Sequence, residues 1–251
     1  MHRAGLPRAL AHRWASIALA VGLVCSGFSL FGSATPAAAA PHRTLSFSGY
    51  TWTIKKSGAH RVGPGPNYFN KNNAYVDSLG RLHLVITKVR RHWTVGEVVN
   101  TRSLGYGTYT WVLASRVDNL DPNMVLGLFT YDDSDPSFNN REIDIEASRW
   151  GNAFDPTNEQ FVVQPYPPTA NLQRITQGSS LPATLSFTWT ATGVSFSAPG
   201  ASPATWTYTG PDTPPNGAAL ADMNFWLNSG HAPMYGQGAQ VIIQSFTFTP
   251  A

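Results

Sequence analysis

The chain has 251 residues, with 17 Lys and Arg against 14 Asp and Glu, and a formal net charge of +3. All three charges of residues 1–40 are arginines, so residues 41–251 carry 14 basic and 14 acidic side chains and no formal net charge. A neutral chain of this kind offers no basic patch for nucleic acid, and we expect no such partner.

Residues 1–40 have the features of a secretory signal peptide. Three arginines form a basic start, an apolar stretch covers residues 15–31, and small residues cover 37–40. Polar and glycine residues interrupt the apolar stretch, which argues against a permanent membrane anchor. We therefore expect a secreted, extracellular monomer that has no membrane contact after cleavage. The only cysteine, Cys25, leaves with this segment, so the mature chain has no disulfide.

Residues 41–251 form one expected domain, long enough for a single hydrophobic core. No segment longer than two turns has a helical period, whereas many short β-rich runs are separated by Gly, Pro, Asn and Asp. This pattern predicts a β-sandwich. The expected strands are residues 50–54, 82–87, 93–101, 106–117, 124–131, 142–147, 160–164, 184–189, 194–196, 205–208, 223–227 and 240–248.

Two loops are candidates for binding. Residues 63–69 form a rigid turn-rich loop that could place Asn67 at the rim of a cleft, or could be a plain connection. Residues 131–135 contain three aspartates whose oxygens could bind calcium, but the spacing is not that of a recognised loop. We interpret the second loop as a solvated turn and predict no metal ion and no cofactor.

The hexapeptide at residues 141–146 has the most informative pattern of the chain. Glu142, Asp144 and Glu146 alternate with Ile143 and Ile145, which is the period of a strand with the isoleucines toward the core. Three acids on one face repel each other and weaken an ordinary strand. The alternatives are a solvated acidic edge strand and a site that needs carboxylates held close together.

Strand geometry favours the second alternative. Residues rise about 3.3 Å each, so Glu142 and Glu146 have Cα atoms roughly 13 Å apart. Side chains that lean toward each other by about 3–4 Å each leave roughly 5–6 Å between the carboxyls. Retaining glycosidases need about 5–5.5 Å, whereas inverting ones need about 6.5–9.5 Å. Asp144 lies between the two and can share a proton with a neighbour, which separates their pKa values.

Glu142-Ile143-Asp144-Ile145-Glu146 resembles the E-x-D-x-E signature of glycoside hydrolase family 16, the laminarinase, lichenase and agarase group. The resemblance implies a concanavalin-like jelly roll of two curved antiparallel sheets and endo-acting hydrolysis of a β-linked polysaccharide. It also implies that Glu142 is the nucleophile, Asp144 its assistant and Glu146 the acid/base. Further segments that resemble the family, in the same order, are residues 105–109, 161–164, 224–227 and 241–248.

Two departures from the family pattern leave the polysaccharide open. Residues 185–189 keep the tryptophan of a family segment but lack its histidine, and residues 194–197 lack an expected aspartate. β-1,3-glucan, mixed-linkage glucan, galactans and xyloglucan therefore all stay possible substrates.

Aromatic platforms and amide groups suit a sugar-binding cleft. Trp226, on a strand that resembles a cleft strand of the family, is the best candidate platform, and Trp150 and Trp93 are further candidates. Gln164 lies on the expected neighbouring strand and could bind a sugar hydroxyl or have a structural role.

Two other functions stay open. A carbohydrate-binding, lectin-like protein of the same fold would use the cleft without cleavage, although the intact acid trio argues against it. A transglycosylase would use the same carboxylates and pass the glycosyl group to a sugar instead of water.

Overall fold

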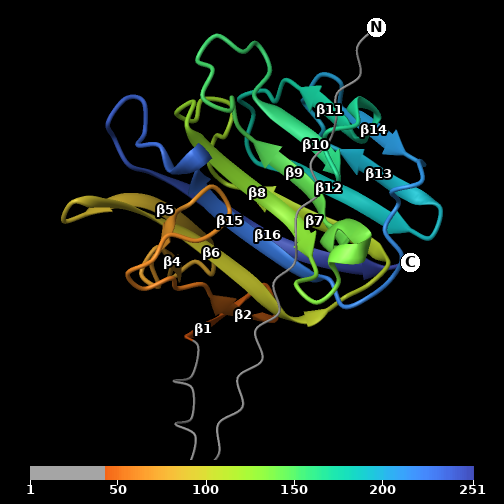
Figure 1. Ribbon diagram of the computed structural model, residues 1–251, viewed down its shortest axis with the longest axis horizontal. Coiled ribbons are helices and arrows are strands. Elements are labelled where there is room, and N and C mark those ends of the chain that lie inside the picture. The colour runs from red at the N-terminus through yellow and green to blue at the C-terminus, as the bar shows by residue number, and fades with distance from the viewer. Residues whose placement is uncertain (1–42) are drawn as a thin grey trace, which may run out of the picture. The chain divides into compact units, whose positions relative to one another are not determined.

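The computed structural model describes residues 43–251, and the predicted signal peptide at residues 1–40 lies outside them. Regular structure in this part of the chain is almost entirely β (Figure 1). It contains no helix long and apolar enough to cross a membrane. The strands are β1 (Thr44–Phe47), β2 (Tyr50–Ile54), β3 (Tyr68–Phe69), β4 (Ala74–Val76), β5 (Leu82–Val89), β6 (His92–Ser103), β7 (Gly107–Leu113), β8 (Met124–Tyr131), β9 (Ile143–Ala147), β10 (Glu159–Val163), β11 (Leu172–Ile175), β12 (Ala183–Thr190), β13 (Gly193–Ser197), β14 (Thr205–Tyr208), β15 (Leu220–Leu227) and β16 (Ala239–Pro250). Short 3-10 helices are η1 (Pro136–Arg141), η2 (Thr169–Asn171) and η3 (Asn228–Gly230).

The strands form one hydrogen-bonded path that folds back on itself. Its order is β11-β10-β9-β8-β15-β6-β5-β16-β7-β12-β13-β14, with β1 to β4 paired at the sides. All pairs are antiparallel except the short pair of β3 with β6. The reversal lies at the β5–β6 hairpin, where Thr87 pairs with Thr94. The two halves of the path are therefore the two sheets of a sandwich (Figure 1).

An aromatic core joins the two sheets. Phe161 of β10 stacks on Phe196 of β13, with ring centroids 4.9 Å apart. Trp52 of β2 packs edge-on against Phe246 of β16 at 5.3 Å. These contacts cross from one half of the path to the other, and burial of such large rings is a major source of stability. The chain thus has the predicted all-β fold, a jelly roll of two curved antiparallel sheets.

The strand β9 has the two faces that its sequence predicts. Ile143 and Ile145 are 0% and 1% exposed and belong to the core between the sheets. The acids alternate with them and occupy the opposite face. In the structure β9 begins at Ile143, one residue later than expected. The backbone carbonyl of Glu142 still accepts a hydrogen bond from the backbone N–H of Gln164 at 3.1 Å. Core packing therefore fixes the side on which the acids project.

Candidate active site

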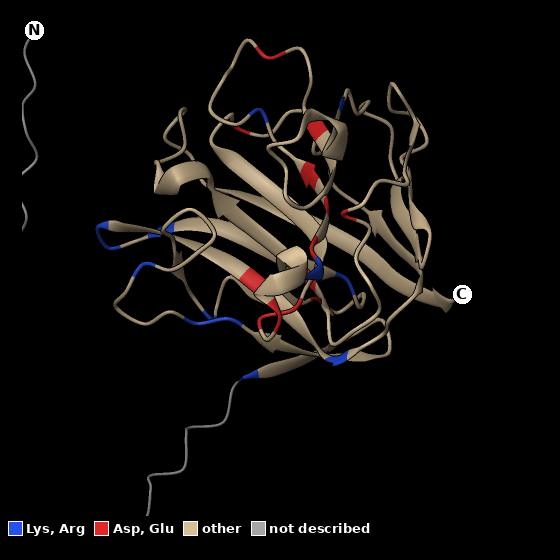
Figure 2. Ribbon diagram, turned by 45° about the vertical axis from the view of Figure 1, so that its right-hand side comes forward, with Lys and Arg blue, Asp and Glu red and all other residues tan. Residues whose placement is uncertain are grey.

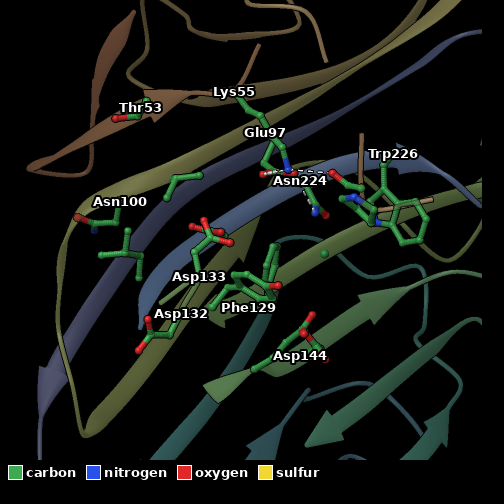
Figure 3. Close-up of a pocket in the computed structure, with 18 of the residues that line it drawn as sticks. Thr53, Lys55, Glu97, Asn100, Phe129, Asp132, Asp133, Asp144, Asn224 and Trp226 are labelled. Carbon is green, nitrogen blue, oxygen red and sulfur yellow. Dashed lines mark hydrogen bonds and ion pairs between the residues drawn. The ribbon is translucent and has the colours of Figure 1, made fainter. Parts of the chain in front are cut away.

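A cleft of about 1090 Å³ lies on the outer face of the sheet that contains β6, β8, β9 and β15 (Figure 3). Strand register brings side chains from these four strands into rows. Glu146 pairs with Gly127, Gly127 with Asn224, and Asn224 with Glu97. Glu142, Asp144 and Glu146 all line the cleft. The structure therefore brings the three predicted catalytic acids to one open site.

The acid trio holds protons more tightly than ordinary carboxylates. Burial raises the pKa of Glu142 to about 8, with a further contribution from the charge of Glu146. Burial likewise raises the pKa of Glu146 to about 7. Asp144 is only 3% exposed, and burial together with the two glutamates raises its pKa well above the usual range. Groups of this kind can give and take protons near neutral pH.

Asp144 is held between two partners. The Gln164 amide donates a 3.0 Å hydrogen bond to its Oδ2 atom. A second hydrogen bond joins Asp144 to Glu142, and it lowers the pKa of Glu142 while raising that of Asp144. This hydrogen bond therefore favours the protonated form of Asp144 and the ionised form of Glu142.

A separate network orients Glu146. Gln160, its cross-strand neighbour on β10, donates from Nε2 to Glu146 Oε2 at 2.8 Å. The other end of the amide, Oε1, accepts hydrogen bonds from Trp150 Nε1 at 3.1 Å and from Arg174 Nη1 at 3.2 Å. Two donors on the oxygen leave only the amide nitrogen to face the carboxylate. Both this hydrogen bond and the charge of Arg174 lower the pKa of Glu146 against the effect of burial.

The far side of the cleft carries a second polar group. Lys55 forms a 2.7 Å ion pair with the buried carboxylate of Glu97, and the Asn224 amide donates to Glu97 at 3.3 Å (Figure 3). Asp222, two residues before Asn224 on β15, also lines the cleft. None of these residues was predicted from the sequence as a site residue. The sequence nevertheless contains a pattern that could have indicated part of this group. Asp222, Asn224 and Trp226 alternate with apolar residues, as expected for side chains on one face of a strand.

Three of the predicted binding residues lie at or beside the cleft. Trp226 lines it and is 7% exposed. Trp150 packs edge-on against Trp226, with ring centroids 5.9 Å apart, and orients Gln160 as described above. Gln164 contacts Asp144. Whether any of them binds substrate stays a prediction.

The other two predicted binding residues do not line the cleft. Trp93 and Asn67 border a small separate pocket of about 110 Å³. Asn67 is 3% exposed, and its amide donates to the carbonyls of Pro64, Gly65 and Leu227. It therefore fixes the loop at residues 63–67 against the end of β15 instead of reaching into the cleft. A Cβ on Gly65 would lie 2.6 Å from the Trp226 ring, so this loop packs directly on the platform.

The aspartate-rich loop after β8 is tied to an arginine. Arg141 forms ion pairs with Asp132 at 2.6 Å and with Asp135 at 2.7 Å. Ser134 also donates to Asp132. Within residues 43–251, no group of His, Cys, Asp and Glu side chains has the geometry of a metal site. The loop leaves Asp133 free of this pairing and exposed at the cleft.

Charge is unevenly distributed over the molecule. Figure 2 shows acidic residues gathered along the middle of the molecule, whereas Lys and Arg lie mostly at outer strands and loops. The cleft thus combines acids of raised pKa, an aromatic platform and amide groups in one groove. This set of groups is suited to proton transfer on a polyhydroxylated ligand.

Comparison with known proteins finds similarity at the level of structure. No family model and no curated protein sequence matches the chain. Among solved structures, the fold matches Bacillus licheniformis β-glucanase with a TM-score of 0.59 at 20% identity, over 79% of this chain and 92% of that one. It also matches a glycoside hydrolase family 16 endo-glucanase from Bacteroides ovatus, with a TM-score of 0.58 at 12% identity, over 79% and 94% of the two chains. A third match is an immunostimulatory antigen and pseudo β-1,3-glucanase of Mycobacterium tuberculosis, with a TM-score of 0.54 at 18% identity, over 80% and 91%. The chain therefore has the fold of family 16 glycoside hydrolase structures.

Proposed function

We propose that the protein is an exported glycoside hydrolase of the family 16 type that cleaves a β-linked polysaccharide internally with retention of configuration. The observation that carries this proposal is the placement of Glu142, Asp144 and Glu146 on one strand face at an open cleft, with raised pKa values. An open groove can admit the middle of a polysaccharide chain, which suits internal cleavage. The leader-like residues 1–40 support export, and the fold comparison supports the reaction class.

The proposed reaction has two steps. Glu142 attacks the anomeric carbon while Glu146 gives its proton to the departing oxygen, which forms a covalent glycosyl-enzyme. Glu146 then removes a proton from water, and the water displaces Glu142. Asp144 hydrogen bonds to Glu142 and so favours the ionised nucleophile. The sequence-based separation of about 5–6 Å between the two carboxyls suits this route.

The proposed roles of Glu142 and Glu146 require that the two carboxyls differ in protonation. Burial raises the pKa of both Glu142 and Glu146, whereas the reaction needs the charge on Glu142 and the proton on Glu146. The three acids titrate as a coupled set, so a single proton can be shared among them. The Asp144 hydrogen bond lowers the pKa of Glu142 and so, together with the motif, supports Glu142 as the nucleophile and Glu146 as the acid.

Replacement of the nucleophile tests the proposal. Glu142→Gln keeps the shape of the side chain but cannot form the glycosyl-enzyme, so we expect turnover to fall at least about 10³-fold, a barrier increase of roughly 4 kcal/mol. Release of reducing ends from a panel of β-glucans, galactans and xyloglucan measures it. Glu159→Gln is the matched control, because Glu159 lies on the neighbouring strand β10 but is fully buried and does not line the cleft. Full turnover by Glu142→Gln on a substrate that the parent cleaves would refute the assignment.

A carbohydrate-binding protein without activity is the second candidate. The observation that favours it is the match to a protein described as a pseudo-glucanase. Binding of a polysaccharide by the parent without release of reducing ends from any polymer would decide for this alternative. Products longer than the starting oligosaccharide would instead identify a transglycosylase.

A further inference from the structure

The acidic charge of the cleft is not fully balanced by the protein. Seven acidic side chains line the cleft, but only two lysines, Lys55 and Lys56, do so. Lys55 is engaged by Glu97, and Lys56 is exposed and forms no ion pair within residues 43–251. Asp132 is neutralised by Arg141. Apart from the catalytic trio, Asp133 and Asp222 are therefore left without a cationic partner.

Asp222 is a buried carboxylate that lacks a partner. Its side chain is on the cleft face of β15, the residue is 5% exposed, and its Oδ1 atom accepts no hydrogen bond from the described part of the chain. Burial raises the pKa of Asp222, Glu97, Asp133 and Glu142 add to this effect by repulsion, and only Lys55 opposes it. A carboxylate in such surroundings gains much from a cation that arrives with a ligand.

Asp133 lies at the open side of the same region. It is exposed, it belongs to the loop after β8, and Figure 3 shows it extending into the cleft between Glu97 and Asp144. Its charge contributes to the raised pKa of both Glu97 and Asp222, and all three residues line the cleft. Two acids that line the same cleft can bind a cationic group of a ligand between them.

We propose that the cleft takes a polysaccharide with free amino groups and binds the ammonium group of an amino sugar between Asp133 and Asp222. This inference names the substrate class of the cleft and rests on the proposed function. An ammonium group supplies several hydrogen-bond donors and a positive charge, which match two acids. Polysaccharides that carry sulfate or carboxylate groups are disfavoured by the same charges.

Binding can be measured apart from cleavage. Two ligands, a hexamer of β-1,4-linked glucosamine and its fully N-acetylated form, differ in charge but share the backbone. Isothermal titration uses the Glu142→Gln protein at about pH 5.5, because a sugar amine is less basic than the protein amines and is mostly protonated only at this lower pH. We expect the amine form to bind at least about 10-fold more tightly than the acetylated form, with the difference shrinking as salt is added.

Two variants test the residues. In the same background, Asp133→Asn and Asp222→Asn should each reduce the preference for the amine form to within about 3-fold, and Asp133 is exposed so that its replacement does not endanger folding. Asp118→Asn is the matched control, because Asp118 is ion-paired with Arg116 outside the cleft, and it should keep the preference. Equal affinity for the two hexamers, binding of neither, or a preference that both variants retain would overturn the proposal.

The two proposals fail in different ways. Release of reducing ends by the parent protein is measured in parallel on both hexamers and on neutral β-glucans. A binding preference without any release would overturn the hydrolase and leave the ammonium site standing. Cleavage of neutral β-glucans together with equal affinity for the two hexamers would overturn the ammonium site and leave the hydrolase proposal standing.

Discussion

Asp144 controls the protonation of the acid trio at the scale of single residues. Burial and two neighbouring glutamates keep its proton in place, and this proton is shared with Glu142 in a hydrogen bond. The bond acts against burial, which otherwise raises the pKa of Glu142. The hydrogen bond to the middle acid thus makes it easier for Glu142, the proposed nucleophile, to ionise.

Removal of the Asp144 carboxyl should therefore move the acidic side of the pH–activity profile. In Asp144→Ala, Glu142 loses the hydrogen bond that favours its ionised form, so its pKa rises and the acidic limb of kcat/KM moves to higher pH. Asp144→Asn still carries a donor and should shift the limb less. Profiles of parent and both variants on one substrate measure this, and an equal shift in both variants would contradict a role for the shared proton.

The acid trio could be predicted from the sequence, whereas the role of Gln160 could not. The alternating acids on one strand predict the trio, and the structure brings all three to the cleft. The amide that orients Glu146 was not predicted, because its role depends on two donors, Trp150 and Arg174, that arrive from other parts of the chain. Long-range hydrogen bonds of this kind leave no local period in the sequence. For the same reason Asn67, chosen from its loop, was assigned to the cleft but holds three backbone carbonyls instead.

Three strands with β-rich sequences were predicted best. The bounds of β2, β8 and β14 agree with the sequence-based ranges to the residue, and both isoleucines of β9 face the core as expected. The missed strands, β1, β3, β4 and β11, have two to four residues each. Such short segments pair only because a neighbouring strand supplies partners, as β10 does for β11. Their pairing is a property of the sheet and not of their own residues.

Gly127 shows how one strand position shapes the cleft. It lies in the row between Glu146 and Asn224, and a Cβ at this position would come within 2.4 Å of Asn224 Oδ1. A glycine in the middle of a strand is otherwise unfavourable, so close approach of a side chain is the physical reason for it. The missing side chain makes room for Asn224 to lie across the sheet toward Glu97.

Gly127→Ala should therefore damage both stability and activity. The added methyl group displaces Asn224 and breaks its contact with Glu97, at a cost of about 1–3 kcal/mol in the free energy of unfolding. Denaturant unfolding and kcat/KM measure the two effects. Gly63→Ala is the matched control, because Gly63 also lines the cleft but has open space around its Cβ position. Equal behaviour of the two variants would contradict the steric role of Gly127.

At the scale of the whole molecule, stability and acidity are coupled through the core. Glu159 faces away from the cleft, between Ala147 and Ile175 in the sheet, and is 0% exposed. Neither of its carboxylate oxygens has a hydrogen-bond partner within residues 43–251. Burial raises its pKa to about 8, with only a partial opposing effect from Arg174. The native state therefore keeps Glu159 protonated at neutral pH, whereas an unfolded chain ionises it near pH 4.5.

The sign of the pH dependence follows from this difference. The native state binds one more proton than the unfolded state between about pH 4.5 and 8, so the contribution of Glu159 to stability is complete below that range and is lost as the pH rises through it. Glu159→Gln cannot ionise and should unfold at a temperature close to that of the parent at low pH. Above about pH 8 it should be more stable by a few kcal/mol, which corresponds to about 2–4 °C in Tm for each kcal/mol. Thermal unfolding at several pH values measures the difference. Asp118→Asn serves as the control, because the lowered pKa of Asp118 confines its effect on stability to acid pH. A Tm difference between Glu159→Gln and the parent that does not change with pH would show that Glu159 is not protonated in the core.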